Sequence, residues 1–71
     1  MSGAERLVRM ANQIARNFEI HGSEAATSQT ATHIKKFWAP SMREDLNAHI
    51  EAGAEGLSEI ALAALQALKA G

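Results

Sequence analysis

The chain has 71 residues, no cysteine, and a formal net charge of −1 from seven basic and eight acidic side chains. We therefore expect a single domain over residues 1–71, which buries only about 60% of the surface that its unfolded chain exposes. Hydrophobic residues make up 46% of the chain, but 15 of them are alanines, which add little buried area. Disulfides and cysteine-based zinc sites are excluded, so association with another chain is the expected support for this small core.

Charge is divided unevenly along the chain. Residues 1–43 carry six basic and three acidic side chains, whereas residues 44–71 carry one lysine and five acids. This split either helps the two halves to pack or orients a docking surface, and the overall charge does not indicate nucleic-acid binding. We find no apolar run long enough to span a bilayer and no signal segment, and we expect a cytoplasmic protein.

The first predicted helix covers residues 4–19. Its apolar stripe, with steps of three and four residues, consists of Leu7, Met10, Ala11, Ile14 and Phe18, with Val8 and Ala15 at the margins. The opposite, polar face holds Glu5, Arg9, Asn12, Gln13 and Arg16. The pattern breaks at Gly22, which suits a helix end, and Ser23 is predicted to cap the next helix.

The second predicted helix covers residues 24–38 and is stronger in its later part. Its apolar face consists of Ala26, Thr30, His33, Ile34 and Phe37. Pro40 is predicted to end it, because a residue before proline avoids the helical conformation. Ser41 and Glu44 form a capping-box pattern at the start of a third helix.

The third helix is predicted to carry Met42, Leu46, His49 and Ile50 on one face and to stop at the GAEG segment, residues 53–56. Ser58 is predicted to cap a fourth helix, whose apolar side holds Ile60, Ala61, Ala64, Leu65 and Leu68. No strand pattern occurs. The predicted fold is therefore all-α, a small bundle of three to four short helices.

We predict no catalytic, cofactor-binding or metal site in this chain. No two of the three histidines stand at helical i, i+3 or i+4 spacing, as a metal site on one helix requires. The adjacent acids Glu44 and Asp45 are explained by the first turn of a helix. The serines lack a nucleophile-elbow motif, and the glycines lack a phosphate-binding pattern. The chain is too small and too poorly equipped for catalysis to be an enzyme by itself.

Residues 33–43, HIKKFWAPSMR, are the most distinctive segment. Large aromatic side chains beside lysine and arginine are typical of interface hot spots. An alternative places Phe37 in the core, with the lysines at the negative end of the helix dipole. A second alternative places Trp38 on nucleic acid with the basic residues on phosphates. We favour the interface, because helical geometry puts Trp38 about 100° from Phe37, at the margin of the apolar face and directed towards a neighbour.

Three blocks of the sequence together resemble one known family. LVRMANQIARNFE (7–19), HIKKFWAPSMR (33–43) and HIEAGAEGLSEIALAAL (49–65) occur here in the order seen in the delta subunit of NAD-dependent formate dehydrogenases that contain molybdenum or tungsten. The resemblance spans nearly the whole chain, and residues 21–32 contribute little to it. It departs from the pattern at Glu59, where we expect proline in many relatives.

The resemblance implies an accessory subunit without cofactors of its own. In that family the catalytic (alpha) subunit carries molybdopterin guanine dinucleotide with molybdenum or tungsten and iron–sulfur clusters, and other subunits carry FMN and the NAD site. The delta subunit is associated with assembly or stability of the complex, or with cofactor insertion or retention in the catalytic subunit. The absence of cysteine agrees with this role, because such a chain cannot ligate an iron–sulfur cluster through thiolates.

Two surfaces are therefore predicted to contact the partner, with neither nucleic acid nor membrane involved. The first consists of Phe37, Trp38, Pro40, Met42 and Arg43. The second lies on the polar face of the first helix and consists of Asn12, Gln13 and Arg16. Two other functions stay open, namely a helical homo-oligomer in which the same apolar margins pair with copies of themselves and a small nucleic-acid-binding regulator.

Overall fold

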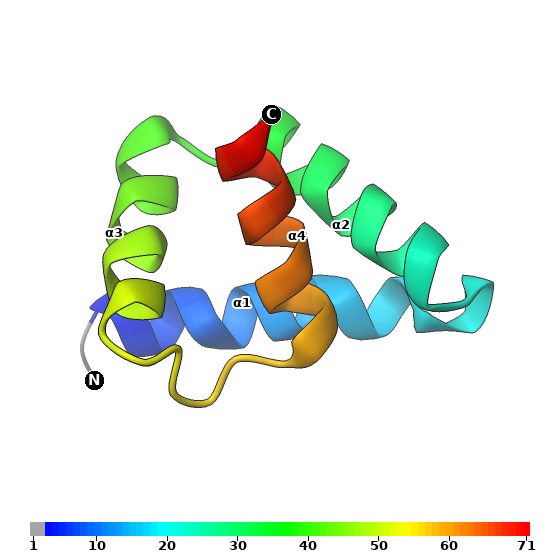
Figure 1. The fold of residues 1–71 in the computed structure, drawn as a ribbon, viewed down its shortest axis with the longest axis horizontal. Helices are drawn as coiled ribbons and strands as arrows, with labels where there is room; N and C mark the ends of the chain where they lie inside the picture. Colours follow the sequence, from blue (N-terminus) through cyan, green and yellow to red (C-terminus); the bar gives the residue numbers. More distant parts are fainter. Residues whose placement is uncertain (1–2) are drawn as a thin grey trace.

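Residues 3–71 form four α-helices and one short 3-10 helix in the computed structural model. The helices are α1 (Gly3–Phe18), η1 (Glu19–His21), α2 (Ser23–Phe37), α3 (Pro40–Glu51) and α4 (Glu59–Ala70). In Figure 1, α1 runs along the base of the molecule, with α3, α4 and α2 arranged across it. The all-α bundle predicted from the sequence is confirmed. The predicted domain limits also include residues 1 and 2, which lie outside the described residues.

The ends of the helices lie within one or two residues of their predicted positions, but two of the three predicted serine caps are wrong. Ser23 is the first residue of α2, and Gly22 occupies the cap position with a φ of 92°. Gly22 suits this place because a positive φ costs glycine little. Ser58 does cap α4, since its Oγ accepts a hydrogen bond from the backbone N–H of Ala61 at 3.2 Å.

The predicted capping box at the start of the third helix is also wrong. α3 begins at Pro40, and its cap residue, Ala39, makes no side-chain cap hydrogen bond. Proline fits the first position of a helix, because its φ is already near the helical value and its missing N–H has no partner there anyway. Pro40 therefore starts α3 and holds Ala39 in an extended conformation, α2 already ends at Phe37, and Ser41 falls inside α3.

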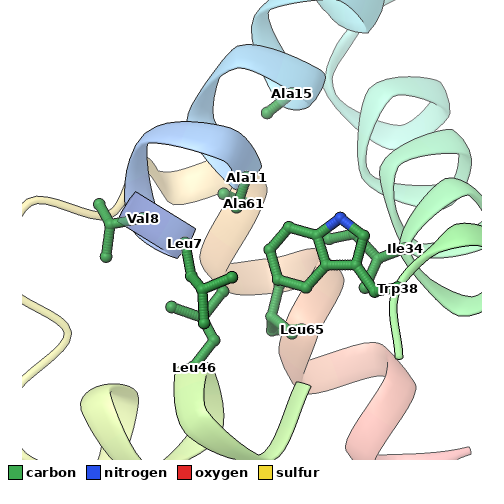
Figure 2. Packing of buried hydrophobic residues seen from close by; sticks show 9 residues of the cluster. All are labelled: Leu7, Val8, Ala11, Ala15, Ile34, Trp38, Leu46, Ala61 and Leu65. Carbon is green, nitrogen blue, oxygen red and sulfur yellow. The ribbon is translucent and has the colours of Figure 1, made fainter. Parts of the chain in front are cut away.

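The core is assembled around small residues on α1, α2 and α4. Alanines on the facing sides of α1, α2 and α4 let the helix backbones approach closely. α4 packs chiefly against α2 and also contacts α1 and α3. Ala26, Thr30 and Ala64 are also fully buried. The main cluster, drawn in Figure 2, consists of Leu7, Val8, Ala11, Ala15, Ile34, Trp38, Leu46, Ala61 and Leu65.

The core lies to one side of the stripe predicted for the first helix. Val8 and Ala15, predicted at the margins, are buried, whereas Met10 and Ile14 are only partly covered. The small side chains of Ala11 and Ala15 allow the neighbouring helices to settle over that side of α1. The larger apolar side chains on the other side remain within reach of solvent. Among residues 3–71, no helix combines the length and the apolar character needed to cross a membrane.

Candidate partner-binding groove

The end of α2 places its two aromatic residues in opposite environments. Trp38 is 6% exposed and belongs to the core, whereas Phe37 is 71% exposed. The sequence predicted Phe37 on the apolar face and Trp38 at its margin, and the structure reverses both positions. The prediction assumed that the helix continued to Trp38, but α2 ends at Phe37 and Trp38 has an extended backbone with ψ 140°. This change of direction turns the indole back over the core.

A shallow, mostly apolar groove of about 590 Å³ runs between α1 and α2 and reaches the start of α3. Met10 and Ile14 form its wall on α1, and the indole of Trp38 is part of its lining. Its complete lining is Arg9, Met10, Gln13, Ile14, His33, Phe37, Trp38 and Met42. The groove therefore brings together Phe37, Trp38 and Met42 from the first predicted surface and Gln13 from the second.

The groove offers donors of hydrogen bonds and positive charge. Arg9 and Gln13 stand at its edge, and no aspartate or glutamate belongs to its lining. The ring of His33 lies against Phe37, with 4.8 Å between ring centroids. Figure 2 shows the indole of Trp38 against Ile34, with its nitrogen directed away from Leu65. A partner entering the groove would meet apolar walls edged by donors.

The indole N–H of Trp38 is available to such a partner. The described residues supply no hydrogen-bond acceptor for it. Among residues 3–71, two side-chain polar atoms are closed off from solvent and have no hydrogen-bond partner, namely Thr30 Oγ1 and Arg43 Nε. The indole nitrogen of Trp38 is not one of them. Trp38 therefore contributes its rings to the core, while its N–H keeps some access to solvent.

Asn12 has an intramolecular role that the sequence did not predict. Its Nδ2 donates to the carbonyl oxygen of Gly56 at 2.9 Å, and its Oδ1 accepts from the backbone N–H of Ser58 at 2.8 Å. His49 makes a third hydrogen bond to this segment, in which its Nε2 donates to the carbonyl oxygen of Glu55 at 2.8 Å. The two Asn12 bonds hold the 52–58 segment against α1, and the His49 bond ties the same segment to α3, so the amide of Asn12 is engaged within the chain.

The remaining predicted interface residues lie outside the groove. Arg16 lines a small polar depression together with Asn12, Ser58 and Glu59, on the other side of α1. Pro40 and Arg43 line another depression, beside the last turn of α4. The eight predicted residues thus occupy three separate places, of which the groove is the most apolar.

Sequence reasoning missed four groove residues, namely Arg9, Met10, Ile14 and His33, as contributors to a surface. One signal was available on α1, where the alanines stand on one side of the apolar stripe and Met10 and Ile14 on the other. Neighbouring helices pack more closely against a helix face with small side chains than against one with large side chains. The exposed end of α2 carried no comparable signal, because its geometry depends on where the helix stops.

Comparison with known families settles the relationship of the chain. Residues 6–65 match the model of the family described as NADH-dependent formate dehydrogenase delta subunit FdsD. The chain belongs to this family. Neither the curated proteins nor the solved structures that were compared with it gave a significant match. The resemblance inferred from the three sequence blocks is confirmed, and the matched region contains the whole groove.

The described part of the chain contains no cluster of metal-ligating side chains. Within residues 3–71, no group of three or more His, Asp or Glu side chains is placed to hold a metal ion. The family name therefore connects the chain with a formate dehydrogenase complex, and the groove is its best-formed candidate for contact with that complex.

Proposed function

We propose that this chain is a non-catalytic accessory subunit that docks through the groove between α1 and α2 onto the catalytic subunit of formate dehydrogenase. The single observation that carries the proposal is the exposure of Phe37 beside a groove whose walls are Met10, Ile14 and Met42. Large apolar side chains gathered around an aromatic anchor are typical of a protein–protein interface.

Docking explains how a chain without a chemical centre supports an enzyme. A small protein that binds only the folded form of its partner stabilises that form by mass action, by about 2.7 kcal/mol when its free concentration is 100 times the Kd. The molybdopterin cofactor, the iron–sulfur clusters, FMN and the NAD site are assigned to the other subunits. This assignment agrees with the absence of cysteine, whose thiolates hold iron–sulfur clusters.

The test is copurification with the other subunits from the source cell. We expect the tagged chain to retain formate dehydrogenase subunits, and Phe37→Ser to release them without unfolding the chain. Thr32→Ser is the control and should retain them, because Thr32 lies on the α2–α4 side, the side of α2 that faces Ala67 and Leu68 of α4. Failure of the wild-type chain to retain any formate dehydrogenase subunit would refute the proposal.

A second measurement separates two forms of the accessory role. Molybdenum and tungsten content of the catalytic subunit is compared with and without the chain. A loss of metal indicates a role in cofactor insertion or retention, whereas unchanged metal with lower thermal stability of the complex indicates structural support. Formate oxidation by the chain alone should be absent, and any turnover would overturn the non-catalytic assignment.

The homo-oligomer and the nucleic-acid regulator predict different behaviour of the isolated chain. Light scattering after size exclusion gives the mass of a closed dimer for the first. Binding to nucleic acid that falls steeply with salt is required for the second. We expect a monomer that does not bind nucleic acid.

A further inference from the structure

Basic residues stand in or beside the groove on both α1 and α2. Arg9 lines the groove, and Arg6 lies one helical turn before Met10 on the same side of α1. On α2, Lys36 is exposed beside Phe37, one turn after His33. Both edges of the apolar groove therefore carry basic residues.

These cations are free to meet a partner. Among residues 3–71, neither arginine nor Lys36 forms an ion pair, although Lys69 and Glu51 do so at 3.7 Å elsewhere. Among the acids of these elements, Glu5 stands one turn before Arg9 on α1 outside the groove lining, Glu19 of η1 lies at the polar depression near Arg16, and Glu24 lies between α2 and α4. Asp45 follows Met42 by one turn on α3 and, like Arg6 and Lys36, is exposed beside the groove lining, so the basic edges are those on α1 and α2.

From this charge pattern we propose that the groove receives an amphipathic helix of the partner subunit, apolar where it enters and acidic along its edges. The inference rests on the proposed function and specifies the segment of the partner that makes the contact. A helix is favoured because the groove lies between two helices, so that an added helix packs into it as another member of the bundle. Carboxylates along the edges of that helix would reach Arg9 and Lys36, and an acceptor on it would meet the indole N–H of Trp38.

The length of the groove sets the size of this helix. Its wall on α1 extends from Arg9 to Ile14, and its wall on α2 from His33 to Phe37, so each wall is slightly more than one helical turn long. A helix in the groove would therefore contribute about two apolar anchors, at i and at i+3 or i+4. Acidic residues would flank these anchors.

The experiment uses the complete chain in the reconstituted formate dehydrogenase complex. A photo-cross-linking amino acid replaces Gln13 in one variant and Thr32 in another. Both positions are exposed, but Gln13 lies at the groove and Thr32 lies on the α2–α4 side. We expect Gln13 cross-links to map to a partner segment with apolar residues at helical spacing and more Asp and Glu than Lys and Arg, and Thr32 to give few.

Charge reversal gives an independent readout. The double variant Arg9→Glu, Lys36→Glu should bind about tenfold more weakly, because each reversal replaces an attraction at the interface edge with a repulsion. Its residual binding should strengthen as salt is added, the opposite of the wild type. The matched control is Lys35→Glu, which makes the same change one residue away on the α2–α4 side and should leave binding unchanged.

The outcomes distinguish this inference from the function on which it rests. If the wild-type chain retains no subunit, the proposed function fails. If it retains the subunits but the double variant binds as the wild type does, or Gln13 cross-links map to a basic segment, the acidic helix is refuted and docking stands. Cross-links from Gln13 to a second copy of this chain would likewise refute the acidic helix and indicate self-association.

Discussion

Phe37 and Trp38 are neighbours in the sequence, and the structure predicts that their removal has opposite effects. Trp38 is 6% exposed within the main core, so Trp38→Ala leaves a cavity that costs about 3–5 kcal/mol. A core in a chain this small rarely supplies more than about 3–5 kcal/mol, so this variant should be largely unfolded. Trp38→Phe retains a ring and should cost about 1–3 kcal/mol, which keeps the comparison measurable.

Phe37 should behave differently because solvent already covers most of it. With 71% of the residue exposed, less than a third of the area that full burial would cover is removed from water. Full burial of phenylalanine contributes about 1.5–3 kcal/mol, so Phe37→Ser should cost less than about 1 kcal/mol. The same substitution should abolish partner retention, since it removes the exposed aromatic anchor of the groove.

Urea denaturation followed by circular dichroism measures both free energies of unfolding. The fluorescence of Trp38, the only tryptophan, provides a second probe of the same transition in the wild type and in Phe37→Ser. A loss of stability in Phe37→Ser equal to that in Trp38→Phe would contradict the assignment of one residue to the surface and the other to the core. So would an unchanged free energy of unfolding in Trp38→Phe.

Three further predictions concern the polar contacts. Asn12→Ala should lower the free energy of unfolding by about 1–2 kcal/mol and speed hydrogen exchange at the Ser58 amide, because two hydrogen bonds to the 52–58 segment are lost. Gln13→Ala is the control: it removes only a hydrogen bond to Asn17 in the next turn and should change neither quantity. Ser58→Ala should cost about 0.5–2 kcal/mol in urea denaturation through loss of the α4 cap, and a cost no greater than that of Gln13→Ala would count against the cap. Lys69→Ala should change the midpoint of thermal unfolding by no more than about 4–8 °C, because the ion pair with Glu51 is solvent-exposed and such pairs contribute at most about 1 kcal/mol. A larger change would contradict this assignment.

The candidate site was only partly predictable, and the reason lies in its geometry. Phe37, Met42 and Gln13 were singled out from residue type, and the structure places all three at one groove. Asn12 was singled out as an interface residue, and the structure adds a role that the sequence did not predict, since its amide binds the 52–58 segment 44 and 46 residues away. Hydrogen bonds between such distant residues leave no periodic signal in a sequence.

The sequence by itself indicated three to four helices, their order and nearly all of their ends. Local forces decide these features, namely the period of apolar residues, the breaks at Gly22 and the GAEG segment, the cap at Ser58 and the fixed backbone of Pro40. The family also followed from local blocks of residues.

Only the tertiary structure decided which part of each apolar stripe is covered. The neighbouring helices pack closely over the side of α1 that carries Ala11 and Ala15, and Met10 and Ile14 on its other side line the open groove. The end of α2 at Phe37 then turns Trp38 inward and leaves Phe37 outside. Both results depend on which of several possible helix–helix contacts gives the closest packing. The periodicity of one helix shows which residues are apolar, but not which of them another helix covers.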